Sequence, residues 1–267
     1  MRTTCTTLVL LLLAGCHSLR PHPGSSTDHN VASPKRYRCT RAAGPILIDG
    51  RLAEPAWRQA TWTEAFVDIE GAARPRPRFA TRVKMLWDDT HFYIAARMDE
   101  PHVWATLTQR DQIVFHDNDF EIFIDPDGDT RQYYEIEVNA LNTIFDLFLV
   151  NTYIDGGPAL HGWDLKGMKH AVHIDGSLND PTDIDRGWSV EFALPWSALG
   201  EAAHRPCPPR PGDTWRVNFS RVEWRTRIVD GRYEKLPDTP EDNWVWSPQG
   251  TINMHLPRRW GYVEFER

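Results

Sequence analysis

The amino-acid sequence predicts an all-β fold: an antiparallel β-sandwich of immunoglobulin-like or jelly-roll-like two-sheet architecture, with one or two short helical turns. Three observations favour this class. Short segments alternate apolar and polar residues, as half-buried strands do. Turn residues separate these segments at spacings typical of sandwiches. Only one stretch has a convincing helical pattern, so a helical or α/β fold is not expected.

Two hairpins are the clearest elements. Residues 82–87 and 92–98 alternate apolar and polar side chains around an Asp-Asp-Thr turn. Residues 120–124 and 134–138 do the same around an Asp-Gly-Asp turn at 127–129. Asp and Gly favour tight turns because they tolerate the backbone angles that a turn requires. Each pair therefore predicts two neighbouring antiparallel strands.

Further strands and two helical segments complete the prediction. Apolar runs or alternation predict strands within 141–150, 187–194 and 215–219. Residues 54–60 predict a short helix, because Pro55 suits a first helical turn and Trp57 can point inward. A second helical turn is expected at 196–199.

The first residues resemble a bacterial export signal with a lipobox. Arg2 precedes an apolar run at 8–13, and Leu13-Ala14-Gly15-Cys16 follows the lipobox pattern. The apolar run is shorter than the roughly 20 residues that span a bilayer. We expect a signal peptide at 1–15 and lipidation of Cys16, with simple secretion as the alternative. Because residue 17 is His and not Asp, the resemblance implies an outer-membrane lipoprotein, facing the periplasm or the cell surface.

The composition bears on the extent of the folded domain, on the class of partner and on the cysteines. A segment at 16–36 is rich in Pro, Ser and Gly and predicts a flexible tether, so the folded domain is expected at 37–267. The net charge of −7 makes nucleic acid an unfavourable partner. Cys39 and Cys207 would share an oxidising compartment and could form a disulfide, but the sequence leaves the pairing open.

Eight segments, in chain order, resemble the family 9 carbohydrate-binding modules and their wider DOMON-like relatives. They are IDGRL (48–52), EPAW (54–57), LWDD (86–89), DFEIFIDP (119–126), GWSVE (187–191), PGDTWRVNFSR (211–221), WSP (246–248) and WG (260–261). The resemblance runs through the whole mature domain. It implies a non-catalytic β-sandwich that binds oligosaccharide or polysaccharide between aromatic rings, with calcium in some members.

The resemblance also implies positions for a sugar site. Phe115 stands near the family's first stacking aromatic, and Met254-His255 stand near the second. Glu121 matches a carboxylate that faces sugar hydroxyls. A structural salt bridge with an arginine such as Arg221 is the alternative reading of Glu121.

Two polar residues and two tryptophans complete the expected site. Asn139 and Arg221 match positions that supply an amide and a guanidinium to polyhydroxy ligands, although Asn139 could instead cap a turn. Of the twelve tryptophans, Trp224 and Trp246 lie in irregular segments and are expected to expose their rings. Four others follow apolar alternation and are expected in the core: Trp57, Trp87, Trp188 and Trp215.

Two acidic segments contain the oxygen ligands that calcium prefers. One holds Asp117 and Asp119, and the other is the loop 125–129. That loop lacks the glutamate of a calcium-binding EF-hand, since Ile136 stands at the twelfth position. A plain hairpin turn is the alternative for this loop, and calcium is kept as a possible cofactor at Asp117 and Asp119.

Other functions have less support in the sequence. It contains no Gly-x-Ser-x-Gly, His-Glu-x-x-His or phosphate-loop motif, so we do not expect an enzyme. A haem-binding DOMON-like domain is an alternative, with Met and His as axial ligands. The candidates for those ligands are Met85, Met168, His170, Met254 and His255. A structural or interaction lipoprotein is the third hypothesis.

Overall fold

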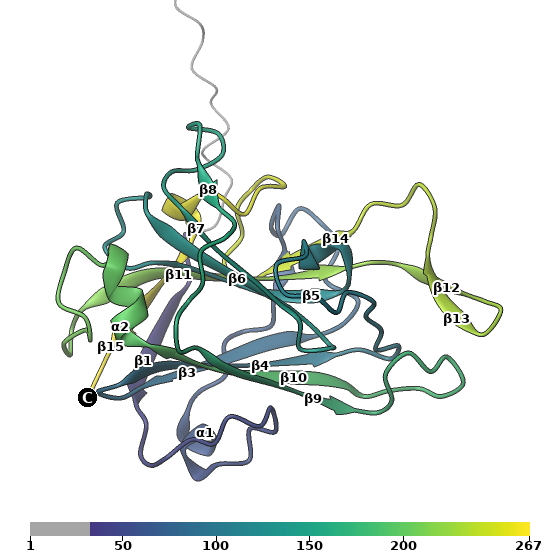
Figure 1. Ribbon diagram of the computed structural model, residues 1–267, viewed down its shortest axis with the longest axis horizontal. Helices are drawn as coiled ribbons and strands as arrows, with labels where there is room; N and C mark the ends of the chain where they lie inside the picture. Colours follow the sequence, from purple (N-terminus) through teal and green to yellow (C-terminus); the bar gives the residue numbers. More distant parts are fainter. Residues whose placement is uncertain (1–32) are drawn as a thin grey trace, which may run out of the picture. The chain divides into compact units, whose positions relative to one another are not determined.

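The computed structural model describes residues 33–267 (Figure 1). The expected signal peptide, Cys16 and most of the expected tether lie outside this range. Two sheets face each other across the main hydrophobic core, and α1 (Pro55–Gln59) lies against the outer side of one sheet. The predicted all-β sandwich is therefore confirmed.

Sheet A carries the candidate site. Its main strands, in spatial order, are β8 (Ala159–Leu160), β7 (Ile144–Leu149), β6 (Tyr133–Asn139), β5 (Asp119–Asp125), β11 (Thr214–Glu223), β15 (Gly261–Phe265) and β1 (Arg36–Arg41). Two further strands lie off this path: β14 (Asp242–Val245) pairs with β11 and also with β2 (Val67–Asp68). Sheet B continues from β1 through β3 (Thr81–Trp87), β4 (His91–Asp99), β10 (Gly187–Pro195) and β9 (Lys169–Asp175). A separate hairpin joins β12 (Thr226–Val229) and β13 (Arg232–Lys235).

Strand β1 connects the two sheets. Its first part pairs with β15 and its last two residues pair with β3, in both cases in parallel. The other strand pairs of the described chain are antiparallel, as the sequence predicts. Strand β1 is thus the one described strand that departs from the predicted antiparallel pairing.

The alternation of apolar residues accounts for the main core. The inward positions of β3, β4 and β10 meet those of β5, β6 and β11 between the sheets. Trp87, Trp188 and Trp215 are buried among them as predicted. Trp57 of α1 is buried on the outer face of sheet B.

The short helices follow the sequence signals. α1 begins at Pro55, and α2 (Trp196–Leu199) follows Pro195. Three 3₁₀ turns are η2 (Val114–His116), η3 (Gly200–Ala202) and η4 (Pro257–Arg259). Within residues 33–267, none of the helices has the length and apolar composition needed to cross a membrane.

The two cysteines of the domain, whose pairing the sequence left open, are free thiols and form no disulfide with each other. Cys39 points from β1 into the core between the sheets. Cys207 lies in the loop after η3, where its thiol donates to the carbonyl oxygen of Trp196 at 3.2 Å. The two side chains belong to different local environments, and neither needs the other to be satisfied.

Candidate functional site

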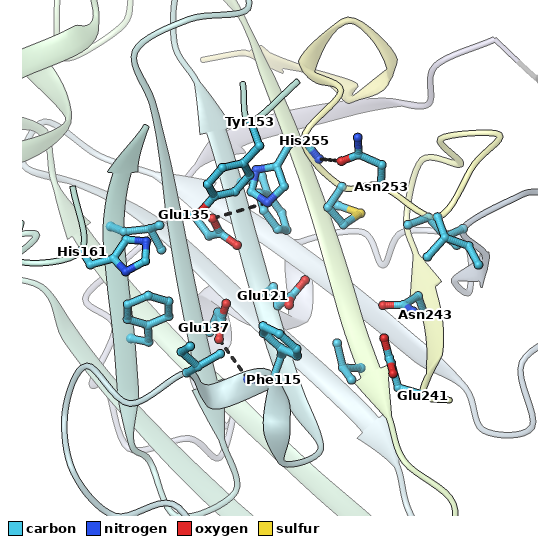
Figure 2. A pocket seen from close by; sticks show the side chains of 18 residues that line it. Phe115, Glu121, Glu135, Glu137, Tyr153, His161, Glu241, Asn243, Asn253 and His255 are labelled. Carbon is cyan, nitrogen blue, oxygen red and sulfur yellow. Dashed lines mark hydrogen bonds and ion pairs between the residues drawn. The ribbon is translucent and has the colours of Figure 1, made fainter. Parts of the chain in front are cut away.

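A cavity of about 440 Å³ opens on the outer face of sheet A. Side chains of β5, β6, β7 and β14 form its floor, and loops near residues 113–115, 153 and 252–255 form its rim (Figure 2). The volume lies within the range of small-molecule sites.

Strand alternation places three glutamates on this floor. Phe120, Ile122 and Ile124 of β5 face the core, so Glu121 faces outward. The hairpin register sets Glu121 directly opposite Glu137 of β6, and Glu135 lies two residues away on the same face. Figure 2 shows the three carboxylates close together on neighbouring strands.

Burial shifts the titration of these carboxylates. Removal from water raises the pKa of Glu121 to about 7. It also raises the pKa of Glu135 and Glu137 well above the ordinary value, and the negative charge of Glu121 adds to both shifts. No lysine or arginine is among the described residues that line the cavity. The floor therefore concentrates carboxyl groups without a basic side chain to pair with them.

The glutamates differ in their hydrogen bonds. Glu137 Oε2 accepts a hydrogen bond from the backbone N–H of Phe115 at 3.0 Å. Glu135 is only 5% exposed, and its Oε2 has no hydrogen-bond partner. A buried carboxylate oxygen without a donor is costly and is uncommon in folded proteins.

Aromatic side chains stand at both ends of the carboxylate cluster. Phe115 from η2 is half-buried at one end, while Tyr153 and His255 lie at the other (Figure 2). The rings of Tyr153 and His255 meet edge to face, with centroids 4.5 Å apart. Burial lowers the pKa of His255 to about 4, which keeps this imidazole neutral near pH 7.

The cavity brings together part of the predicted site. Phe115 and Glu121 both line it, together with Met254 and His255. Sequence reasoning missed Glu135, Glu137 and Tyr153. The two glutamates had a signal, because Tyr134, Ile136 and Val138 alternate inward and leave residues 135 and 137 on the face of Glu121. Tyr153 lies in a loop and had no such signal.

Trp224 borders the cavity region from outside. Its indole Nε1 donates to the carbonyl oxygen of Phe115 at 2.8 Å, and Lys235 Nζ lies 3.6 Å from its ring centroid. The ring lines a separate, smaller cavity of about 250 Å³. Trp224 therefore supports the backbone at Phe115 but does not line the cavity that holds Glu121.

Arg221 does not reach the cavity, and the prediction of a sugar contact there is wrong. Its side chain is 0% exposed. The guanidinium donates to Glu100 Oε2 at 2.7 Å and to Glu223 Oε2 at 2.8 Å. Further donors go to Thr81 Oγ1 and the carbonyl oxygen of Asp99. Because these partners are internal, no donor remains for a ligand.

Asn139 and Trp246 also require correction as ligand residues. The Asn139 amide bridges the chain internally: its nitrogen donates to the Leu107 carbonyl, and its oxygen accepts from the N–H groups of Leu141 and Thr143. Trp246 is 2% exposed and packs in the main core. Asn139 is thus a turn-stabilising amide, the alternative reading, and Trp246 offers no free ring face.

The predicted calcium residues do not act together. The carboxylate of Asp117 accepts from two backbone N–H groups, the Thr106 hydroxyl and the Asn139 amide, so its lone pairs are engaged. Asp119 is different. One of its oxygens has no partner, and its carboxylate lies within 4.8 Å of those of Glu121 and Glu137. The calcium pair Asp117 and Asp119 is therefore wrong, and Asp119 belongs to the acidic floor.

The loop 125–129 is a hairpin turn. Asp125 accepts hydrogen bonds from the N–H groups of Gly128 and Thr130, which is the usual use of Asp in a turn. The plain-turn reading accounts for these contacts.

The haem candidates are dispersed. Met85 is buried between the sheets, and Met254 and His255 lie at the cavity of sheet A. Met168 and His170 line a different surface hollow near β9. Residues from different locations among these three could not hold one haem iron between them. The structure therefore gives no support to a haem site that combines them.

Comparison with solved structures identifies proteins of similar fold. The solved structures to which the chain is similar include three that we describe here. A family 9 carbohydrate-binding module from Caldicellulosiruptor kristjanssonii, in complex with cellotriose, has a TM-score of 0.57 and 17% identity, covering 87% of this chain and 94% of that one. A family 9 module from the same organism in complex with glucose also has a TM-score of 0.57 and 17% identity, covering 87% of this chain and 97% of that one. A chain from Bacteroides uniformis has a TM-score of 0.63 and 18% identity, covering 88% of this chain and 100% of that one.

Sequence comparison agrees with the structural one. The chain is 24% identical over 172 residues to the exoglucanase XynX of Acetivibrio thermocellus, which is 63% of this chain but only 13% of that protein. The model of the carbohydrate family 9 binding domain-like family matches residues 48–206. This match covers more than half of the chain, and the chain belongs to the carbohydrate family 9 binding domain-like family.

Proposed function

We propose that this protein binds oligosaccharide or polysaccharide, without catalysis, in the cavity on the outer face of sheet A. One observation carries the proposal. The half-buried ring of Phe115 and the buried carboxylate of Glu121 line the same cavity. These are the two positions at which the family resemblance expects a stacking ring and a hydroxyl-binding acid.

The chemistry of this pair suits a sugar. A phenyl face removes the apolar C–H face of a sugar ring from water. A carboxylate accepts strong hydrogen bonds from neighbouring hydroxyls. Tyr153 and His255 add aromatic surface at the opposite end, about where the second stacking residue is expected. Because the cavity is open to solvent, we expect weak affinity for a single sugar and stronger binding of a chain.

The comparisons support glucose-containing ligands as the first to test. The neighbouring family 9 modules are described in complex with cellotriose and with glucose. Their low identity to this chain leaves the side chains of the site free to differ.

The arrangement of acids favours binding over hydrolysis. A glycosidase uses two carboxylates that flank the scissile bond. Here Glu121, Glu135 and Glu137 lie side by side on one face of two adjacent strands, beneath the cavity (Figure 2). We therefore propose a capture role.

We further propose that the protein is an outer-membrane lipoprotein anchored through Cys16, which retains glycan near enzymes that degrade it. The lipobox-like Leu13-Ala14-Gly15-Cys16 supports this proposal. Metabolic labelling with a fatty-acid analogue tests it. Label on the native chain but not on Cys16→Ser is the expected result, and label on neither chain would contradict the anchor.

A glycan array followed by calorimetry tests the binding function. We expect Phe115→Ala to weaken binding of the best ligand by about tenfold, and Glu121→Ala by at least as much. Ile228→Ala and Glu264→Ala are matched controls, because both residues are exposed and lie outside the cavity. No ligand on the array, or equal affinity in all four variants, would overturn the proposal.

A further inference from the structure

The floor of the cavity carries a cluster of carboxyl groups, and no lysine or arginine of the described lining pairs with them. Glu121 and Glu137 are directly opposite each other on β5 and β6, and Glu135 is on the same face. Like charges that face each other across a strand pair are destabilising. Asp119, also on β5, has its carboxylate within 4.8 Å of those of Glu121 and Glu137. The residues lining the described cavity include a further acid, Glu241, but neither lysine nor arginine.

Elsewhere the same molecule pairs two of its buried acids with a buried arginine. Glu100 and Glu223 are buried as deeply as the floor glutamates, and each receives a hydrogen bond from Arg221 at 2.7 or 2.8 Å. The acidic floor has no arginine or lysine of this kind among the described residues that line the cavity.

Open acceptors remain at the floor. Glu135 Oε2 has no hydrogen-bond partner although the residue is 5% exposed, and it lines the cavity. The nearest cationic candidate is His255 Nε2 at 4.0 Å, beyond hydrogen-bond distance. Since burial lowers the pKa of His255 to about 4, that ring does not supply the missing charge near pH 7.

We infer that the cavity selects sugar units that carry a free amino group, whose ammonium lies among Glu121, Glu135 and Glu137. The inference rests on the proposed binding function and specifies its ligand. An ammonium has three N–H donors, which matches a cluster of acceptors, and its hydrogen bonds to carboxylates are charge-assisted. A hydroxyl at the same ring position can donate once and brings no charge. An N-acetylated amine is neutral and larger.

Three tetrasaccharides with the same β-1,4 linkage separate these cases: glucosamine, glucose and N-acetylglucosamine oligomers, titrated into the protein by calorimetry. We expect the glucosamine oligomer to bind at least about tenfold more tightly than the glucose oligomer. Equal or tighter binding of the glucose or N-acetylglucosamine oligomer would overturn the inference and leave the proposed function standing. Binding of none would overturn both.

Isosteric variants test the charge directly. Glu135→Gln and Glu137→Gln should lower affinity for the glucosamine oligomer far more than affinity for the glucose oligomer, and so remove most of the preference. The exposed Glu264→Gln is the matched control and should keep the preference. A preference that persists in both floor variants would overturn the inference, with thermal unfolding used to verify that each variant is folded.

Two further controls exclude general attraction to an acidic protein. A lysine tripeptide presents ammonium groups without a sugar ring, and its binding should be at least about tenfold weaker than that of the glucosamine oligomer. Equal binding of the tripeptide would overturn selection of an amino sugar. Repeating the titrations with calcium and with a chelator should give the same preference. A glucose oligomer that binds as tightly as the glucosamine oligomer only in calcium would instead assign the acidic floor to a metal ion.

Discussion

The outer faces of the two sheets each bury a glutamate, but they treat it in opposite ways. On sheet B, α1 and the loop before it cover the strands, and Glu191 accepts hydrogen bonds from the N–H groups of Asp49 and Gly50 and from Trp57 Nε1, at 2.6–2.9 Å. On sheet A, a cavity remains open above Glu135, whose Oε2 has no donor. Glu191 thus has all its hydrogen-bond donors within the protein and stabilises the fold. Glu135 keeps an acceptor that a ligand in the cavity can use.

The covering loop of sheet B is held closely in place. Gly50 has a φ of +81°, and an added Cβ would lie 2.6 Å from the backbone nitrogen of His173. Only glycine allows the loop to approach β9 this closely. This packing explains why the Ile-Asp-Gly segment belongs to the fold and not to the binding site.

Glu191→Ala gives the largest expected effect on stability. The substitution leaves three donors without an acceptor, two of them buried, so the free energy of unfolding should fall by about 3 kcal/mol. Urea denaturation measures this change, and the exposed Glu264→Ala provides the control. A loss below about 1 kcal/mol would show that the donors of sheet B find other partners and that the contrast between the two faces is weaker than proposed.

Glu135→Gln should have the opposite sign. Burial and the nearby charge of Glu121 raise the pKa of Glu135 above its ordinary value of 4.5, so ionisation costs stability in the folded state. The cost is absent below about pH 4.5 and grows as the pH rises toward the folded pKa. The variant should therefore be more stable than the native protein by about 1 kcal/mol near pH 8, and the difference should vanish near pH 4.

Denaturation across this pH range checks that prediction. Glu264→Gln should show no comparable change, because Glu264 is exposed. A stability difference for Glu135→Gln that is negative, or constant with pH, would contradict an unneutralised buried charge.

Trp224→Ala tests how far the sugar site extends, and it has the smallest expected effect, a small loss of sugar affinity. It removes one hydrogen bond to the carbonyl of Phe115 but no surface that lines the cavity. Sugar affinity measured by calorimetry should therefore fall only about twofold to threefold. A loss as large as that of Phe115→Ala would mean that the sugar reaches the smaller neighbouring cavity.

Strands with regular alternation could be predicted from the sequence because each carries its own signal. The hairpins β3–β4 and β5–β6 are of this kind, as is the face of Glu121. Strand β1 is different. It pairs in parallel with one strand of each sheet, and its neighbours are far along the chain. No local pattern specifies such a partner.

The site was harder to predict because it depends on what covers each face. Arg221 follows Trp215, Val217 and Phe219 at intervals of two, so its alternation already pointed inward. The family resemblance assigned its guanidinium to a ligand, but the buried acid Glu100 comes from a distant strand end and pairs with it in the interior. Tyr153 joins the cavity only through the packing of a loop on the folded sheet.

The indole N–H signals of the protein's NMR spectrum test the central claim most directly. Trp224 Nε1 donates a hydrogen bond to the carbonyl oxygen of Phe115, and Trp260 Nε1 donates one to the carbonyl oxygen of Met254. Phe115 and Met254 both line the sheet A cavity. Trp57 Nε1 is bonded to Glu191 on the opposite side of the sandwich. Titration with a bound oligosaccharide should shift the signals of Trp224 and Trp260 and leave that of Trp57 unchanged. A shift of Trp57 with no change at the other two would contradict a glycan site on sheet A.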